Sequence, residues 1–185
     1  MSARYGARAS ARVSILFSNA GNHGIGPLES YDEEAFDRTY RVHVRGAFLA
    51  CKYGAVRMRD GGSIIVTSSL AGLHGGEGAG QNIAYTTMKH AQTGIVRAAA
   101  RALAPRGIRV NSLNPGPIDN AFQADIEKRL GAVSGVDLTA AIDRAIPLRR
   151  HAGPDEVAST ALYLASPLSS YVTGHVHVVD GGLGS

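Results

Sequence analysis

The sequence is poor in cysteine and aromatic residues: its 185 residues include one cysteine, no tryptophan and 6% aromatic side chains. The single cysteine, Cys51, cannot form a disulfide within the chain, so nothing indicates an oxidising compartment. No apolar run approaches the ~20 residues that a membrane helix requires, and no apolar stretch follows Met1 as in a secretory signal. These absences predict a cytoplasmic protein with no membrane partner.

The sequence also has no dense cluster of charge of one sign. Its 19 Lys and Arg residues against 15 Asp and Glu residues give a formal net charge of +4. The small basic groups at residues 4–12 and 149–150 have no aromatic residues among their arginines that would stack on bases, apart from Tyr5. Because nucleic-acid binding normally needs a dense basic stripe, we expect no nucleic-acid partner. A chain of this length can bury roughly 70% of its unfolded surface, which suits one domain.

Short β-branched runs alternate with long helical patterns. The runs, which are bounded by Gly, Pro or Asn, are typical of strands and lie at 13–17, 63–67, 108–113 and 175–179. The helical patterns lie at 33–58, 83–104 and 154–165, with two shorter ones at 121–130 and 138–145. Strands that are separated by crossover helices pair in parallel. The pattern therefore predicts an α/β fold with a doubly wound parallel sheet, in a three-layer α/β/α arrangement.

Small and polar residues follow three of these strands. Asn19-Ala20-Gly21 comes after the first, Ser68-Ser69 after the second and Asn114-Pro115-Gly116 after the third. In such sheets, ligands bind beyond the carboxyl ends of the strands. We therefore expect these segments to converge on one cleft.

A tyrosine and a lysine stand four residues apart near the start of the predicted helix at 83–104. Tyr85 and Lys89 would share one helical face, which brings the ammonium near the phenol. At ~4 Å and an effective dielectric of 20, the Coulomb energy is about 4 kcal/mol, enough to lower the pKa of a phenol towards neutrality. Ser69 could present its hydroxyl to the same volume. Taken alone, however, such a pair is more typical of a solvated helix surface.

The ordered set of motifs is more specific than any one of them. Asn-Ala-Gly, Ser-Ser, Y-x-x-x-K, Asn-Pro-Gly and the final Val-Asp-Gly-Gly together resemble the short-chain dehydrogenase/reductase family over residues 13–183. The resemblance implies a partial Rossmann-like domain at 13–185, with a substrate lid at 119–150 and an unassigned segment at 1–12. It also implies NAD or NADP as cofactor and hydride transfer between a secondary alcohol and a ketone. Apolar positions in the lid suggest a moderately apolar small-molecule substrate.

The resemblance assigns roles to individual residues. It implies that Tyr85 is the acid/base, that Lys89 holds the nicotinamide ribose and lowers the tyrosine pKa, and that Ser69 polarises the substrate carbonyl. The other matched positions would contact the cofactor: Asn19, Ala20 and Gly21 on its adenosine side, and Pro115, Gly116 and Ile118 at the nicotinamide carboxamide. No metal site is expected, since His175 and His177 have no third ligand nearby.

Two matched positions differ from the usual residue. His43 stands where most relatives carry an asparagine that holds a water of the proton relay. An imidazole titrates near 6.5, which predicts an extra acidic limb in the pH profile, although His43 could instead be a structural residue in a helix bend. Asn120 stands where a threonine often contacts the carboxamide, so that this contact is plausible.

A larger departure concerns the start of the family pattern. Relatives begin with a strand and a T-G-x-x-x-G-x-G turn around the pyrophosphate, which this sequence does not contain, so we expect an N-terminally truncated domain. The strand at 13–17 should then form an apolar sheet edge. A non-catalytic interaction module is therefore the alternative to an enzyme. Either form is expected to assemble as a homo-oligomer through the helices at 33–58 and 83–104.

Overall fold

The computed structural model describes residues 12–75 and 79–185, and its centre is a parallel sheet of 4 strands in the order β1-β2-β3-β4. The strands are β1 Val13–Ser18, β2 Met58–Thr67, β3 Arg109–Pro115 and β4 Val176–Val179. Every neighbouring pair is parallel. The predicted α/β fold with its parallel sheet is therefore confirmed. Most of the segment at 1–12 lies outside the described residues.

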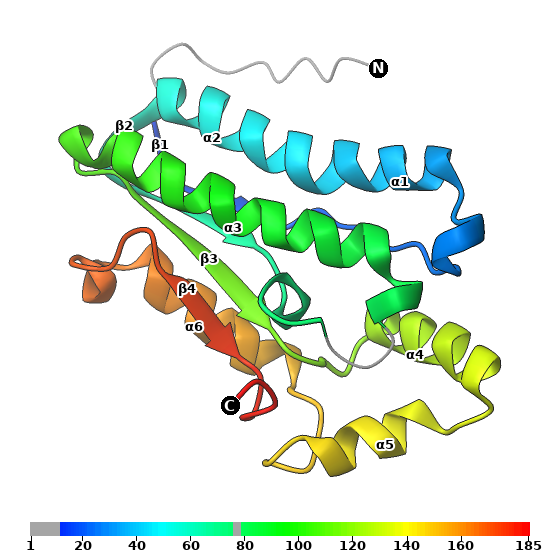
Figure 1. Ribbon diagram of the computed structural model, residues 1–185. Helices are drawn as coiled ribbons and strands as arrows, with labels where there is room; N and C mark the ends of the chain where they lie inside the picture. The colour runs from blue at the N-terminus through cyan, green and yellow to red at the C-terminus, as the bar shows by residue number, and fades with distance from the viewer. Residues whose placement is uncertain (1–11, 76–78) are drawn as a thin grey trace.

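Helices cover both faces of the sheet (Figure 1). One face carries α1 Glu33–Tyr40, α2 Gly46–Arg57 and α3 Ile83–Leu103, and the other carries α6 Pro154–Ala165. Along β2, Ile64 and Val66 point into the larger core under α2 and α3, whereas Ile65 packs with Leu164 of α6. Alternate side chains of a strand point to opposite faces, so this continuous apolar run fills two cores.

The single helix predicted at 33–58 is wrong in its middle and at its end. A π-helical turn at Arg41–Arg45 separates α1 from α2, and it holds His43 fully buried. Met58 already belongs to β2, with an extended backbone, because its side chain enters the core. β2 consequently begins well before residue 63, and the register between β1 and β2 shifts between Val13 and Ile15.

Beyond β3 the chain forms α4 Ala121–Ser134 and α5 Leu138–Ala145. α4 is longer than the predicted helix at 121–130, since it continues through Gly131. It ends at Gly135, whose φ of 71° places it in the left-handed region that glycine adopts without strain. Among the residues that the structure describes, no helix is long and apolar enough to cross a membrane.

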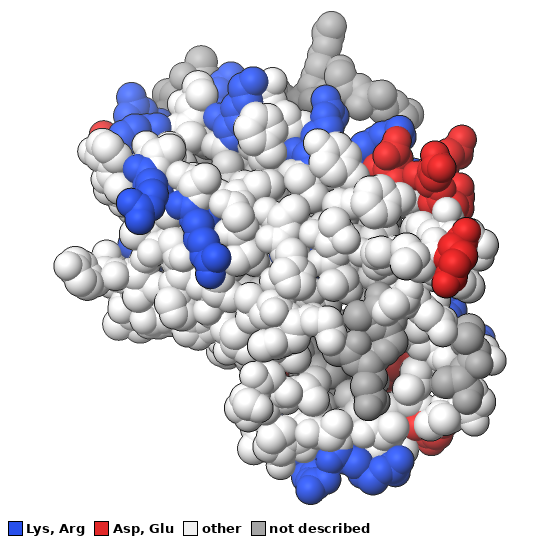
Figure 2. Space-filling view, in the orientation of Figure 1, with Lys and Arg blue, Asp and Glu red and all other residues white. Residues whose placement is uncertain are grey.

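Two parts of the surface carry little charge. β1 is an edge strand within the described part of the chain, and Ile15 and Phe17 are 51% and 46% exposed on it. On the opposite side of the larger core, Figure 2 shows a face that is mostly uncharged at its centre, with acidic side chains gathered near α1. The expected apolar edge is therefore present.

Candidate active site

The polar segments at the carboxyl ends of the strands do converge. They line a hollow of about 290 Å³ together with residues from α3 and α4. Its walls comprise Asn19, Gly21, His43, Thr67, Ser68, Ser69, Tyr85, Lys89, Pro115, Gly116, Ile118, Asn120, Phe122 and Gln123. Of the residues expected to form the site, only Ala20 does not line this hollow; it is exposed between Asn19 and Gly21.

The two hydroxyl groups with a predicted role in chemistry lie together. Tyr85 forms a side-chain hydrogen bond with Ser69, which favours the ionised phenol. Burial acts in the opposite direction and more strongly, so the pKa of Tyr85 is raised above its usual value. The expected lowering of this pKa by the neighbouring ammonium is thus wrong for the protein alone. Lys89 Nζ lies over the Tyr85 ring, 5.2 Å from its centroid, but burial of the phenol decides the direction of the shift.

Lys89 is an unusual lysine because its side chain is buried and 3% of the residue is exposed. Its Nζ donates a hydrogen bond to the backbone oxygen of Thr67 at 2.8 Å. The structure gives it no ion pair with a carboxylate of the described residues. Burial therefore lowers the pKa of Lys89 to about 7. An amine with this pKa can carry or release a proton near neutral pH.

His43 lies behind the tyrosine, and the two rings meet edge to face at 5.5 Å. Its Nε2 is 2.7 Å from the backbone oxygen of Asn22 and 3.1 Å from its backbone nitrogen, while its Nδ1 has no partner in the described residues. Burial, and then the charge of Lys89, lower the pKa of His43 to about 4. The acidic limb expected near 6.5 is therefore corrected to a lower pH, since the ring is neutral there.

Glycine is required where the cleft approaches this ring. A Cβ added at Gly21 would lie 3.1 Å from His43 Cε1. A Cβ at Gly116 would lie 2.8 Å from the Cβ of Asp180, the acidic residue of the final Val-Asp-Gly-Gly. That carboxylate accepts hydrogen bonds from the backbone nitrogens of Gly182 and Gly184. The last motif of the sequence therefore supports the cleft rather than lining it.

Several residues support the site in ways that the sequence did not predict. Ser68 Oγ donates to the backbone oxygen of Lys89 at 2.9 Å, and Asn114 Nδ2 donates to the backbone oxygen of Ser69 at 2.8 Å. Both contacts join segments far apart in the chain, so no local pattern predicts them. Phe122 and Gln123 enter the wall from α4. Asn120 is the N-cap of that helix, because its Oδ1 accepts from the backbone nitrogen of Gln123 at 2.9 Å.

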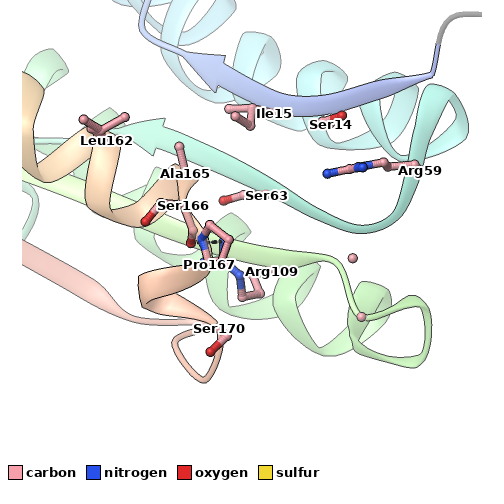
Figure 3. Close-up of a pocket in the computed structure, with 12 residues that line it drawn as sticks. Ser14, Ile15, Arg59, Ser63, Arg109, Leu162, Ala165, Ser166, Pro167 and Ser170 are labelled. Carbon is pink, nitrogen blue, oxygen red and sulfur yellow. Dashed lines mark hydrogen bonds between the residues drawn. The ribbon is translucent and has the colours of Figure 1, made fainter.

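A larger hollow, of about 500 Å³, lies on the other flank, between β1, β2 and α6 (Figure 3). Its buried polar groups are already paired. Arg109 donates to the backbone oxygens of Leu164 and Ser166 and to Ser169 Oγ, and Ser63 Oγ also donates to Leu164. Among the described residues, no group of three His, Cys, Asp or Glu side chains is arranged to hold a metal ion. The smaller hollow is therefore the candidate active site.

Comparison with known proteins agrees with this geometry. A family model described as enoyl-(acyl carrier protein) reductase matches residues 3–184. Short-chain dehydrogenase reductase 3a of Arabidopsis thaliana is 38% identical over 176 residues, which is 92% of this chain and 65% of that protein. Trans-4-hydroxycyclohexanecarboxylate dehydrogenase of Sinomonas cyclohexanicum is 34% identical over 171 residues, 92% of this chain and 60% of that protein.

A solved structure is similar over nearly the whole chain. It is a blue fluorescent protein from a metagenomic library in complex with NADPH, with a TM-score of 0.83 and 31% sequence identity. The match covers 94% of this chain and 66% of that one. The chain thus spans about two thirds of the length of the proteins that it matches.

Proposed function

Since this chain belongs to the short-chain dehydrogenase/reductase family, we propose that it is an NAD(P)-dependent oxidoreductase of secondary alcohols and ketones. The observation that carries the proposal is the arrangement of three side chains at one end of the sheet. Tyr85 and Ser69 share a hydrogen bond, and the buried Lys89 lies against the Tyr85 ring. These are the groups that proton transfer to a carbonyl oxygen requires.

The residues present fit the nicotinamide side of such a cofactor. Lys89 is a buried amine whose donors are not all used by Thr67, so it can donate to a hydroxyl of the nicotinamide ribose. Pro115, Gly116 and Ile118 line the same hollow. The cofactor supplies or accepts the hydride when it is bound. The NADPH in the similar structure supports this assignment, and either NAD or NADP is compatible with the residues of the cleft.

The protonation states suit the reductive direction. Because burial raises its pKa, Tyr85 is protonated at neutral pH and has a proton to give to a carbonyl oxygen. The Ser69 hydroxyl can donate a hydrogen bond to the same oxygen, where negative charge develops. Lys89 titrates near 7, so it can replace the proton that the phenol gives up.

The lid at 119–150 suggests the kind of substrate. Phe122 and Gln123 extend from α4 into the wall, and the Phe122 ring lies 6.4 Å from that of Tyr85. An aromatic face beside an amide suits an apolar alcohol or ketone with a polar substituent. The relative named for a hydroxycyclohexanecarboxylate is consistent with such a substrate.

One observation favours the alternative, a non-catalytic interaction module. Among the described residues, β1 is an edge strand with exposed apolar side chains that could pair with another chain. For either function we propose a homo-oligomer in the cytoplasm. Phe48, Tyr53 and Val56 of α2 are exposed apolar residues. The face of the molecule in Figure 2 is largely uncharged at its centre, and both observations support association through α2 and α3.

Titration of the protein with NADH and NADPH, followed by their fluorescence, tests the proposal. We expect a dissociation constant of about 100 μM or below, worth roughly 5.5 kcal/mol. Lys89→Gln should weaken binding about tenfold or more, whereas Lys52→Gln, a change at an exposed lysine of α2, should leave it unchanged. A folded protein that binds neither nucleotide would contradict the proposal. Affinities that are the same before and after Lys89→Gln would also contradict it.

A further inference from the structure

A second cluster of titratable side chains lies beside the cleft, around His151. This residue belongs to the connection between α5 and α6 (Figure 1). Its Nε2 is 2.7 Å from Glu127 Oε1 of α4, and its Nδ1 is 2.8 Å from Asp143 Oδ1 of α5. The ring thus bridges two carboxylates from two different helices.

The bridge is shielded from water on one side. The His151 side chain is 10% exposed and that of Glu127 is 6% exposed, whereas that of Asp143 is 37% exposed. Glu127 also accepts hydrogen bonds from Thr139 Oγ1 of α5 and from Gln123 Nε2, the latter at 2.8 Å. Five side chains therefore form one network, with Glu127 at its centre.

The number of protons in this network follows from its geometry. Ionised carboxylates only accept hydrogen bonds, and a neutral imidazole has a single N–H to donate. A neutral ring would therefore place a lone pair against one of the two carboxylates. Both short contacts are satisfied together when both ring nitrogens are protonated. The pKa of Glu127 is lowered because hydrogen bonds from Thr139, Gln123 and His151 outweigh its burial, so this carboxylate is ionised.

Two connections lead from the network to the cleft. Gln123, which lines the cleft, donates to Glu127. The residue after His151, Ala152, exchanges backbone hydrogen bonds with the segment at 117–119: its nitrogen donates to Pro117 at 3.0 Å and its oxygen accepts from Asp119 at 2.9 Å. Ile118, between them, is a wall residue. Both sides of the lid wall are thus attached to the His151 bridge.

We propose that His151, protonated on both ring nitrogens, is the positioning residue that ties α4 to α5 and so holds Gln123 and Ile118 in the cleft wall. The consequence for substrate binding rests on the proposed oxidoreductase function, but the bridge itself does not. A deprotonated ring keeps one of its two contacts and loses the other, which leaves the hydrogen bond from Thr139 to Glu127 as the remaining side-chain link described between α4 and α5. The lid is therefore tightened by protonation of a residue that touches neither substrate nor cofactor.

The surrounding charges agree with this assignment. Burial lowers the pKa of His151, but the hydrogen bonds and charges of Glu127 and Asp143 outweigh it, so the pKa is raised above that of free histidine. On the connection itself, Arg150 is held by Glu156 and by the His151 backbone oxygen, and on α4 Arg129 is paired with Asp125. Because the pKa is raised on folding, the stabilisation is complete below the usual histidine pKa and is lost as pH rises through the raised value.

Nuclear magnetic resonance of the histidine rings in the intact chain tests the bridge directly. We expect the signal that disappears in His151→Gln to titrate above free histidine and to show protons on both nitrogens at pH 6. Glu127→Gln should lower its midpoint more than Asp143→Asn, because Glu127 is the more buried partner. A midpoint at or below that of free histidine would overturn the proposal.

Hydrogen exchange separates positioning from general stability. In Asp143→Asn, which keeps the imidazole and the size of its partner, α4 and α5 should exchange several-fold faster below the wild-type midpoint, while β2 and β3 keep their protection. His90→Gln, at an exposed residue of α3, is the matched control and should change neither. Equal effects on lid and sheet, or no effect on the lid, would contradict the proposal.

The kinetic readout completes the test. As pH rises through the His151 midpoint, KM for the ketone should increase about 3-fold to 10-fold, and Asp143→Asn should remove this dependence of KM. The change of kcat that comes from deprotonation of Lys89 should be the same in both proteins. A kcat that falls while KM is constant would contradict a positioning role. If the folded protein has no oxidoreductase activity, the proposed function fails, and the ring titration and hydrogen exchange still decide the bridge.

Discussion

The two hollows of this protein lie against the same sheet but differ in what their polar groups do. In the smaller one, at the carboxyl ends of the strands, Lys89 and Tyr85 are buried with hydrogen-bonding capacity that the protein does not use fully. In the larger one, between β1 and α6, Arg109 and Ser63 donate hydrogen bonds to backbone oxygens at the end of α6. Buried polar groups with unused hydrogen-bonding capacity therefore indicate an active site better than the volume of a hollow does.

The apolar surfaces differ in the same way. Ile15 and Leu162 leave apolar area exposed on the β1 flank, and among the described residues that line this hollow only Arg109 has a shifted pKa. At the cleft, the apolar residues are few and lie next to reactive groups, as Phe122 does beside Tyr85. The β1 flank is therefore expected to bind the surface of another chain, whereas the cleft is expected to bind and transform a small molecule.

The largest expected effect comes from removing the proton donor of the cleft. Tyr85→Phe should lower kcat about 10²-fold to 10⁴-fold, the usual contribution of general acid catalysis, because only the hydroxyl is lost. Tyr171→Phe, at a fully exposed tyrosine on the α6 side, is the control and should leave kcat unchanged. Steady-state rates of ketone reduction decide between them. Equal activities of the two variants would remove the distinction between the regions.

The next effect concerns the cost of burying Lys89. Since its pKa falls to about 7 on folding, the unfolded chain binds more protons between pH 7 and about 10, so stability should rise over that range. Lys89→Met has no charge to bury, and the rise should be lost. Denaturant unfolding of both proteins from pH 6 to pH 10 measures this difference. Parallel curves would show that Lys89 is not desolvated as the structure describes.

A smaller effect is expected from the backbone behind the cleft. A Cβ at Gly72 would lie 2.7 Å from both the Lys89 backbone oxygen and Ser68 Oγ, so Gly72→Ala should destabilise the fold by about 1–3 kcal/mol. Gly94→Ala, on the exposed side of α3 with nothing within 4 Å of the added Cβ, should stabilise it by roughly 0.5–1 kcal/mol. Thermal unfolding of the pair distinguishes them, and the same sign for both would be evidence against a rigid cleft wall.

The smallest effect on stability is expected at the β1 flank. Ile15→Thr keeps a β-branched residue at a half-exposed edge position, so the free energy of unfolding should change by about 0.5 kcal/mol or less. The same change should weaken concentration-dependent association through the edge, as measured by sedimentation velocity. A large loss of stability without any change in association would indicate that Ile15 serves the fold and not a surface.

The sequence predicts the cleft better than its electrostatics. Strand ends and the spacing of Tyr85 and Lys89 are local features, so the meeting of these residues with Ser69 follows from the fold pattern. The pKa directions do not: both the lowered value for His43 and the raised one for Tyr85 are set by burial among segments far apart in the chain. The same holds for the π-helical turn that places His43 inside, and for Met58, whose place in the core ends the helix before it.

The bridge around His151 shows the same limit more strongly. Its carboxylates come from residues 127 and 143, and no spacing along the chain links them to residue 151. Only the packing of α4 against α5 brings them together.

In the proposed function, the nicotinamide cofactor transfers a hydride to a carbonyl carbon while Tyr85 protonates the oxygen. The direct measurement is to incubate the protein with NADPH or NADH deuterated at the transferred position of the nicotinamide and a prochiral ketone, and to analyse the product by mass spectrometry. We expect an alcohol with one deuterium on its carbinol carbon, formed by the wild type and Tyr171→Phe and nearly absent with Tyr85→Phe. An alcohol without deuterium, or no product from a folded protein that binds the nucleotide, would contradict it.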